Sequence, residues 1–336
     1  MGFEKGVNQM TTIKEIAELA NVSTATVSKV INGKDQYISE ATRQKVLEIV
    51  EREGYIPNGV AKSLKMKKTK TIGIIVPDVM NLFFSELARG VEDAAEKEGY
   101  SVILCNTDNK QSKEEKYLGV LHEKMVDGII MTAAEVSMNK SIKKSKIPTV
   151  LVDRDIELDK PAGRITVNNE EGAFIATKFL IEKGCKNIGF ISSQKKNKPS
   201  AERLKGYIRA LEENGLEVDE KKIFLQNFTI DTGYEGVVTL LKETKIDGIF
   251  CGNDLIAIGS MRALKQNNLK VPEDVKVIGF DNISVSKFTD PPLTTIKQPI
   301  YQLGEEAVKM LIAIIDKKDI DMQKVLKTEL IERGSC

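Results

Sequence analysis

Short apolar segments alternate with amphipathic segments from Thr71 almost to the end of the chain, and this alternation constrains the fold more than any other feature. Strands are expected at Thr71–Val76, Ser101–Cys105, Gly128–Met131, Thr149–Val152, Asn187–Ile191, Gly248–Cys251 and Val275–Phe280. Helices are expected at Phe83–Lys97, Glu170–Lys183, Glu202–Asn214, Thr232–Lys242 and Ile256–Asn267. Such repetition predicts an α/β fold of doubly wound parallel sheets with helices on both faces.

A repeated motif predicts that this region consists of two similar lobes. Residues 126–130 read VDGII, and residues 246–250 read IDGIF. We expect a first lobe at about 71–167 and 298–326, and a second at about 168–297 and 327–336. Residues 1–57 would form a separate all-α head, disordered at 1–10, and residues 58–70 would link it to the body.

Charge is distributed unevenly between these parts. The 336 residues include 50 Lys or Arg and 49 Asp or Glu, but residues 1–70 carry 12 basic against 8 acidic residues. A small basic head therefore precedes a mildly acidic body, which excludes both a uniformly basic nucleic-acid coat and an acidic disordered chain.

Cysteine usage and hydropathy point to a cytoplasmic protein. The four cysteines are far apart and contain no C-x-x-C pair, so they do not form a disulfide framework. No apolar run approaches the ~18 residues that span a bilayer, and the first ten residues lack a signal-peptide core. We expect no membrane partner.

The head has the pattern of a helix-turn-helix. Thr12 and Glu15 form a capping box, Ser23 can cap a second helix, and a third helix begins at Ser39 and ends near Gly54. Two short helices joined by a tight turn, with small polar residues at the start of the second, fit the major groove of DNA.

The outward face of the second helix carries the predicted base contacts. Thr24, Ala25 and Lys29 are expected to read bases, while Lys14, Lys34 and Arg43 would hold phosphates. The full set of candidate DNA-binding residues in the head is Thr12, Ser23, Thr24, Ala25, Thr26, Ser28, Lys29 and Asn32. The alternative is a three-helix bundle that binds nothing, but the charge, the caps and the polar face favour DNA binding.

The linker permits two interpretations. Asn58 could cap a helix of about two turns, which is marginal alone, with Ala61 and Leu64 on one face. Two such helices could pack together in a dimer, with Leu64 inserted into a minor-groove step. Spacing alone favours a solvated linker.

Polar and aromatic residues follow the predicted strands. Ligands of doubly wound sheets bind beyond the carboxyl ends of the strands, so these residues are candidates for a binding site. They are Asn81, Phe83, Phe84, Asp153, Arg154, Arg203, Phe228, Asn253, Asp254, Phe280, Asp281 and Gln298. Carboxylates, guanidinium and amide groups bind hydroxyls, and aromatic faces pack on the C–H faces of a sugar ring.

This inventory favours a small polyol such as a monosaccharide. The set contains no histidine, no Cys–His pair and no metal-ligand cluster, and the chain has neither a G-x-G-x-x-G nor a P-loop motif. We therefore expect no cofactor and no metal.

Each residue alone has a structural alternative. Phe83 and Phe84 could be core residues, and Asn253 with Asp254 could only cap a helix. Asp153 and Arg154 could form a surface ion pair of little value, and Asp281 could be a turn residue. Their common position at strand ends favours the site.

From Thr11 to Gly334 the sequence resembles the lactose-repressor family of bacterial transcription regulators. Residues 12–33 match its helix-turn-helix, and Tyr55-x-Pro57-Asn58-x-x-Ala61-x-x-Leu64 matches its hinge helix. The resemblance implies a homodimer that binds a palindromic operator of double-stranded DNA. It also implies a hinge helix with DNA contacts from Asn58, Ala61, Lys62 and Leu64, in place of a solvated linker.

The body resembles ribose repressors and periplasmic ribose-binding proteins. The matching effector contacts are Asn81, Phe83, Phe84, Asp153, Arg154, Arg203, Phe228, Asn253, Phe280, Asp281 and Gln298. The loop Thr132-Ala133 departs from the pattern, because ribose binders have an amide there. The resemblance implies a repressor that a pentose, with D-ribose as the first expectation, releases from DNA.

Other functions remain as alternatives. The effector could be another monosaccharide, a purine or a phosphoprotein co-repressor, or the chain could be a sugar-binding transport protein. An enzyme is not expected, because the single histidine, His122, lies far in sequence from every strand-end cluster.

Overall fold

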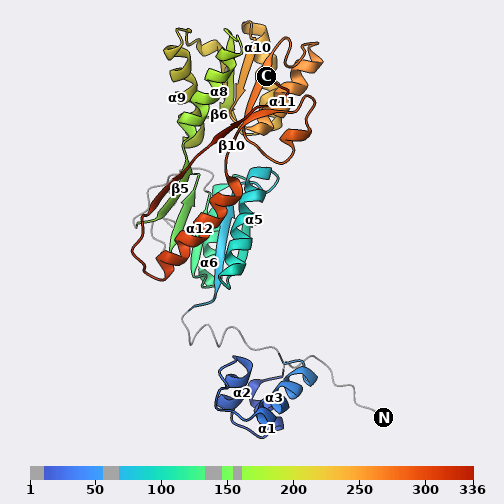
Figure 1. Ribbon diagram of the computed structural model, residues 1–336, viewed down its shortest axis with the longest axis vertical. Coiled ribbons are helices and arrows are strands. Elements are labelled where there is room, and N and C mark those ends of the chain that lie inside the picture. The colour runs from blue at the N-terminus through green and yellow to red at the C-terminus, as the bar shows by residue number, and fades with distance from the viewer. Residues whose placement is uncertain (1–10, 56–67, 133–145, 154–160) are drawn as a thin grey trace, which may run out of the picture. The chain divides into compact units, whose positions relative to one another are not determined.

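The computed structural model describes residues 11–55, 68–132, 146–153 and 161–336 (Figure 1). The chain divides into two compact units, Met1–Thr69 and Lys70–Cys336. We call the described residues 11–55 the head and residues 70–336 the body.

The head contains three helices, α1 (Ile13–Ala20), α2 (Thr24–Ile31) and α3 (Glu40–Arg52). Each begins at a hydroxyl cap, since Thr12, Ser23 and Ser39 accept a hydrogen bond from a backbone amide three residues later. The three helices enclose one small apolar core formed by Ile16, Ala17, Ala20, Val27, Val30, Val46 and Ile49. The predicted capping box and helix starts are confirmed.

The described residues of the body form two six-stranded sheets. The first has the order β11-β5-β4-β3-β1-β2, and every pair of neighbouring strands in it is parallel. Its strands are β1 (Thr71–Val76), β2 (Ser101–Asn106), β3 (Gly128–Met131), β4 (Thr149–Val152), β5 (Gly163–Val167) and β11 (Gln323–Leu326). The central strands are buried on both faces, as their continuous apolar sequences require.

The second sheet repeats this order as β12-β10-β9-β8-β6-β7. Its strands are β6 (Ile188–Ser193), β7 (Ile223–Gln226), β8 (Gly248–Cys251), β9 (Lys276–Asp281), β10 (Thr294–Lys297) and β12 (Glu329–Ile331). Only β12 runs antiparallel to its neighbour. The predicted α/β fold with two doubly wound sheets is confirmed.

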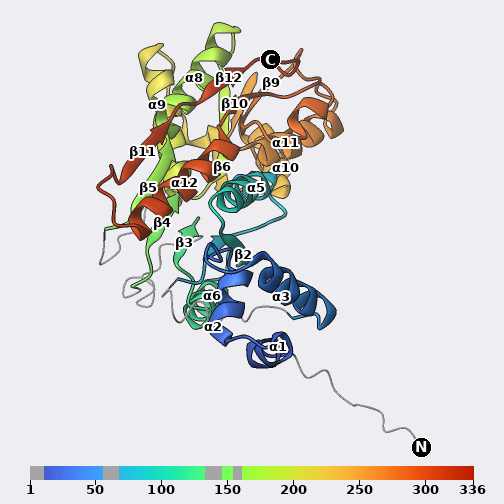
Figure 2. The same cartoon turned by 60° about the horizontal axis from the view of Figure 1, so that its bottom comes forward.

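Helices cover the faces of both sheets. The first lobe carries α5 (Leu82–Lys97), α6 (Gln111–Glu123) and α12 (Ile300–Ile315), and Figure 2 shows α12 against its strands. The second carries α8 (Asn169–Glu182), α9 (Lys198–Glu213), α10 (Ile230–Glu243), α11 (Asp254–Gln266) and the short turns η1 (Glu220–Lys222) and η2 (Ser286–Phe288). None of the helices in the described ranges is long and apolar enough to cross a membrane.

Within residues 161–336 the chain passes between the two sheets three times, at residues 167–169, 297–300 and 326–329. The two lobes also meet through apolar side chains. Ile283 of the second lobe belongs to the same buried cluster as Phe84 of the first, and Leu255 and Ile258 of α11 pack against that cluster. The body is therefore one compact unit built of two connected lobes.

Several elements differ from the sequence-based expectation. The strands β5, β11 and β12 were not anticipated, because they are short and contain charged residues. The helix α12 was not anticipated either. Helix α9 begins four residues earlier than expected, at Lys198, with Pro199 in its first turn. Proline is well tolerated there because its missing amide hydrogen has no intrahelical acceptor.

The close packing of α8 against α9 provides a stability test. A side chain at Gly206 would overlap the backbone oxygen of Glu170, whereas one at Gly119, on the exposed side of α6, would meet nothing within 4 Å. Gly206→Ala should lower the free energy of unfolding by about 1–3 kcal/mol. Gly119→Ala should raise it by about 0.5–1 kcal/mol. Urea unfolding of both variants measures the contrast, and equal changes would contradict the packing described.

Candidate ligand pocket and DNA-binding face

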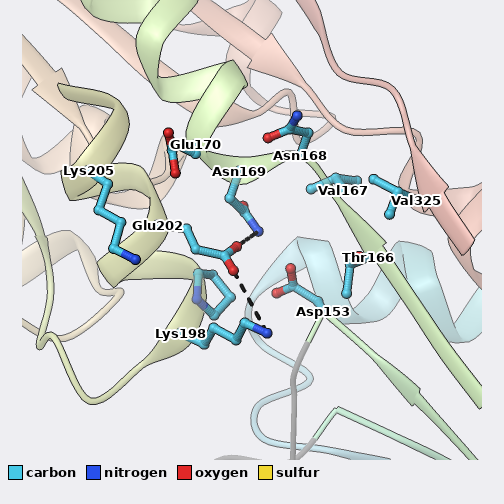
Figure 3. A pocket seen from close by; sticks show the side chains of 11 residues that line it. Asp153, Thr166, Val167, Asn168, Asn169, Glu170, Lys198, Glu202, Lys205 and Val325 are labelled. Carbon is cyan, nitrogen blue, oxygen red and sulfur yellow. Dashed lines mark hydrogen bonds and ion pairs between the residues drawn. The ribbon is translucent and has the colours of Figure 1, made fainter. Parts of the chain in front are cut away.

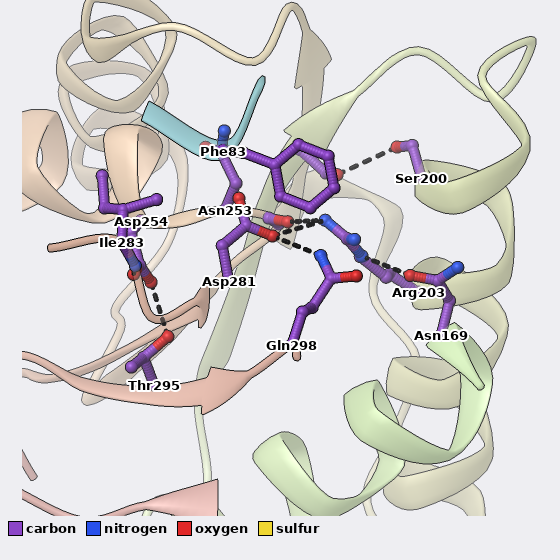
Figure 4. A network of polar contacts seen from close by, with 12 residues as sticks. Phe83, Asn169, Ser200, Arg203, Asn253, Asp254, Asp281, Ile283, Thr295 and Gln298 are labelled. Atoms are coloured by element: carbon purple, nitrogen blue, oxygen red, sulfur yellow. Dashed lines mark hydrogen bonds and ion pairs between the residues drawn. The ribbon is translucent and has the colours of Figure 1, made fainter. Parts of the chain in front are cut away.

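Nine strand-end residues from both lobes line one small cavity in the body. They are Asn81, Phe83, Phe84, Asp153, Arg203, Phe228, Asn253, Asp281 and Gln298, and the space between them that is open to water is about 20 Å³. Figure 4 shows several of them converging on Arg203. All nine belong to the predicted effector set, so the structure brings together residues that are up to 217 positions apart in sequence.

Arg203 is a buried side chain of this cavity, with 3% of its surface exposed, and its guanidinium makes several contacts. Its Nε donates to Asn169 Oδ1 at 3.0 Å, and its Nη1 donates to the backbone oxygen of Gly252 at 2.5 Å. The guanidinium carbon lies 3.8 Å from the ring centre of Phe280 and 5.7 Å from that of Phe228. These contacts fix a buried cation beside the cavity.

Among the predicted effector residues that the structure describes, Phe280 is the one that does not line the cavity. It was predicted to touch the ligand, but its fully buried ring lies in the core of the second lobe and is not among the residues that line the cavity. The ring supports Arg203 from beneath. Neighbouring residues of a strand point to opposite faces. The sequence alone does not show whether Phe280 or Asp281, at the end of β9, is the one that faces the cavity.

Asp281 and Gln298 form a second polar contact at the cavity. Gln298 Nε2 donates to Asp281 Oδ1 at 2.6 Å, and Arg203 Nη1 lies 3.8 Å from the same oxygen. Burial raises the pKa of Asp281 well above its usual range, and the nearby Arg203 only partly opposes this rise. Gln298 Oε1 is buried and accepts no hydrogen bond from the described residues. Such an oxygen is available to a hydroxyl donor.

The two asparagines of the cavity also cap helices. Asn81 Oδ1 accepts from the amide of Phe83 at 3.1 Å, and Asn253 Oδ1 accepts from the amide of Ile256 at 2.9 Å. Capping and cavity lining are therefore compatible in these residues. Phe83 and Phe84 contact each other edge to face, with ring centres 5.1 Å apart, and they belong to the first-lobe core as well as to the cavity.

Asp254 belongs to a structural network and does not line the cavity. Its carboxylate accepts from Thr295 Oγ1 at 2.5 Å, from Ser286 Oγ at 2.6 Å and from the amide of Ile283 at 2.9 Å. It thus ties the start of α11 to the loop that carries Ile283. Burial raises the pKa of Asp254 to about 6, although the three hydrogen bonds favour the ionised form.

A second cavity adjoins the first and was not foreseen (Figure 3). The two cavities share Asp153, and Asn169 of the second accepts the hydrogen bond from Arg203 described above. It is lined by Asp153, Thr166, Val167, Asn168, Asn169, Glu170, Lys198, Pro199, Glu202, Lys205 and Val325. Most of these residues lie at the end of β5 or in the first turns of α9. Recognition of β5 and of the true start of α9 in the sequence would have located them.

Other expected residues lie elsewhere. Arg154 is outside the described residues, and Thr132 is buried with its hydroxyl donating to the backbone oxygen of Ile75. His122 is exposed on α6. Within the described ranges, no group of three or more histidine, cysteine or acidic residues could hold a metal ion.

The head exposes the residues expected to read bases. Thr24, Ala25 and Lys29 are exposed on one side of α2. The remaining candidates mainly stabilise helix ends: Ser23 Oγ lies 2.9 Å from Thr26 Oγ1, and the Asn32 amide donates to the backbone oxygen of Ser28 at 2.6 Å.

Two further head residues also have structural contacts. The Thr12 hydroxyl and amide contact the Glu15 carboxylate, which completes the capping box. Arg43, expected at a phosphate, pairs with Asp35 at 2.9 Å and Glu40 at 3.2 Å. The hinge candidates Asn58, Ala61, Lys62 and Leu64 lie outside the described residues.

A helix-turn-helix head joined to a two-lobed body with a cavity between its lobes defines a ligand-responsive transcriptional repressor. Residues 12–58 match the model for bacterial regulatory proteins of the lacI family, and residues 177–336 match that for a periplasmic binding protein-like domain. The chain belongs to the lacI family.

Its relatives are transcriptional regulators. The chain is 42% identical over 332 residues to the HTH-type transcriptional regulator RegA of Clostridium saccharobutylicum, covering 97% of this chain and 99% of that protein. It is 41% identical over 325 residues to catabolite control protein A of Priestia megaterium, with coverage of 96% and 97%. It is 39% identical over 331 residues to the HTH-type transcriptional repressor PurR of Vibrio atlanticus, with coverage of 97% and 98%.

The chain is also similar to solved structures of proteins of this kind. A LacI-family regulator of Enterococcus faecium with bound ribose is 32% identical, with a TM-score of 0.71 and coverage of 79% of this chain and 98% of that one. The Alkaliphilus metalliredigens protein complexed with D-xylulofuranose is 33% identical, with a TM-score of 0.71 and the same coverage. The lac repressor dimer bound to operator has a TM-score of 0.86 at 24% identity, over 97% and 99% of the two chains, and shares the fold.

The raised pKa of Asp254 predicts a pH dependence of stability. Because the folded protein binds this proton more tightly than the unfolded chain, Asp254 favours folding at low pH, and this contribution is lost as the pH rises from about 3.8 towards about 6. The stability of the wild type relative to Asp254→Asn should therefore fall by about 1 kcal/mol between pH 5 and pH 7. Urea unfolding of both proteins at each pH tests this, and a constant difference would refute it.

Proposed function

We propose that this protein is a repressor that binds a palindromic operator as a homodimer and is released from DNA by a pentose, with D-ribose as the effector. The observation that carries the proposal is the buried polar cluster of Arg203, Asp281 and Gln298 beside the rings of Phe83, Phe84 and Phe228. Its charged donor, its carboxylate and its unsatisfied amide oxygen match ring hydroxyls, while the aromatic rings match the C–H faces of a sugar.

The proposed effector contacts are the nine residues of the cavity together with Arg154. Phe280 supports Arg203 in this arrangement. The structural relatives solved with ribose and with D-xylulofuranose favour a pentose. The sequence contains neither a G-x-G-x-x-G nor a P-loop motif for phosphate, which supports a neutral sugar over a nucleotide.

Two other effectors have specific support. The curated relatives include catabolite control protein A and PurR, so a phosphoprotein co-repressor and a purine are the competing possibilities. Another monosaccharide is the nearest chemical alternative. A transport protein is disfavoured by the helix-turn-helix match at residues 12–58.

The proposed mechanism couples the two sites through the body. Residues 1–57 act as the DNA-binding head, residues 58–70 as a hinge helix with Leu64 in the minor groove, and residues 71–336 as the effector-binding and dimerisation body. Sugar bound between the lobes favours their closure, which separates the hinge helices and weakens DNA binding. Linkage then requires that operator DNA weakens sugar binding by the same factor.

Calorimetry with D-ribose tests the pocket. The wild type should bind D-ribose, and Arg203→Ala should weaken binding at least about 30-fold, because a charged hydrogen-bond donor beside the sugar is lost. Arg209→Ala is the matched control on α9, since Arg209 pairs with Glu170 and Glu171 away from the small cavity. Gln298→Met offers a second variant that removes the unsatisfied oxygen. Equal affinity of Arg203→Ala and wild type would exclude this pocket, and heat of binding from a purine alone would identify the alternative effector.

The DNA-binding face predicts two distinct classes of variant. Lys29→Ala should relax the preference for one base pair, by about 1–3 kcal/mol, because Lys29 faces the bases. Lys34→Ala should weaken binding to all sequences alike. It should also reduce the slope of the logarithm of the binding constant against the logarithm of the salt concentration by about 1. Binding to a pool of operator variants at several salt concentrations separates the two, and identical profiles would contradict the assignment of α2 as the recognition helix.

A further inference from the structure

The motif repeated in the two lobes has the same structural role in each. Asp127 lies before β3 and Asp247 before β8. The Asp127 carboxylate accepts from the amide of Lys70 at 3.0 Å, and its own amide donates to the oxygen of Thr71 at 2.8 Å. Each contact has a counterpart in the second lobe. There, the Asp247 carboxylate accepts from the amide of Lys186 at 2.9 Å, and its amide donates to the oxygen of Asn187 at 3.0 Å.

The two aspartates fix different segments of the chain. Asp247 holds the connection from α8 into β6, which is internal to the second lobe. Asp127 holds Lys70, the first residue of the body, at the point where the segment from the DNA-binding head enters. The same pair of hydrogen bonds therefore fixes an internal connection in the second lobe and the junction with the head in the first lobe.

Further contacts make Lys70 an anchor point. Its Nζ lies 4.1 Å from the ring centre of Tyr100, a buried residue, and its backbone oxygen accepts from the amide of Ser101 at 2.9 Å. Lys70 has a φ of 54°, in the left-handed region that is unfavourable for a residue with a side chain. The surrounding contacts compensate for this cost, a pattern that is common at functional positions.

We propose that Asp127 is a positioning residue for operator binding, because it anchors the junction through which the body holds each head. The proposal rests on the family-level function of the protein as a DNA-binding repressor, and it is independent of the identity of the effector. An anchored junction leaves fewer backbone residues to be ordered when the heads engage DNA. Each backbone residue that loses these contacts must be ordered when DNA binds. This ordering should weaken operator binding roughly 5- to 30-fold per residue.

The experiment compares Asp127→Ala with Asp247→Ala, the matched control that removes the same carboxylate from the second lobe. The DNA probe is a duplex that the wild type enriches from a random-sequence pool, and stability is measured by urea unfolding. Both variants should lose stability, and Asp247→Ala at least as much as Asp127→Ala, because the Asp247 carboxylate also accepts from the amide of Asn187 at 2.8 Å. Only Asp127→Ala should lose affinity for the duplex, roughly 5- to 30-fold, with an unchanged salt slope because the phosphate contacts of the head remain intact.

Two further variants sharpen the test. Asp127→Asn keeps an oxygen that can accept from the Lys70 amide and should restore most of the affinity. Tyr100→Leu removes the ring beside Lys70 Nζ and should weaken binding in the same direction as Asp127→Ala. Equal losses of DNA affinity in Asp127→Ala and Asp247→Ala, or none in either, would overturn the proposal. Failure of the wild type to enrich any duplex would instead contradict DNA binding itself.

Discussion

The burial of Arg203 in the second lobe, beside the cavity, is the interaction on which the ligand pocket depends. A guanidinium removed from water is costly unless its donors and charge are compensated. Here the compensation comes from Asn169, the oxygen of Gly252, the carboxylate of Asp281 and the face of Phe280. The cluster is incomplete on one side, since Gln298 Oε1 has no donor among the described residues. A polyhydroxy ligand would complete it, which links occupation of the cavity to the stability of the arrangement around it.

The two lobes share one strand order but contribute unequally to this site. The first lobe supplies the paired phenylalanines, Asn81 and Asp153, whereas the second supplies the buried cation and its partners. Asp254 adds a link between them, because it fixes the loop whose Ile283 packs in the first-lobe core. Both lobes of the duplicated fold thus contribute aromatic and charged side chains to the cavity, and the buried cation comes from the second.

Much of the fold and the pocket could be predicted from the sequence. Parallel strands end at one edge of their sheet, so residues after successive strands, such as Asn253 and Asp281, had to lie near one another. The short strand β5 was not recognised, because it has only five residues and includes a charged one, and the adjoining cavity at Asn169 was missed with it. The supporting role of Phe280 also depends on tertiary packing, because only the position of Arg203 shows which face of the ring is used.

The three passages of the chain between the sheets determine how this protein can be recombined. Removing one lobe requires three cuts, so neither lobe can be exchanged as a cassette. The head, by contrast, precedes the body as a single continuous segment, with the boundary between the two units at Thr69 and Lys70. A new DNA specificity can therefore be grafted in one crossover, whereas a new ligand specificity must arise by point substitutions inside the cavity or by replacement of the body as a whole.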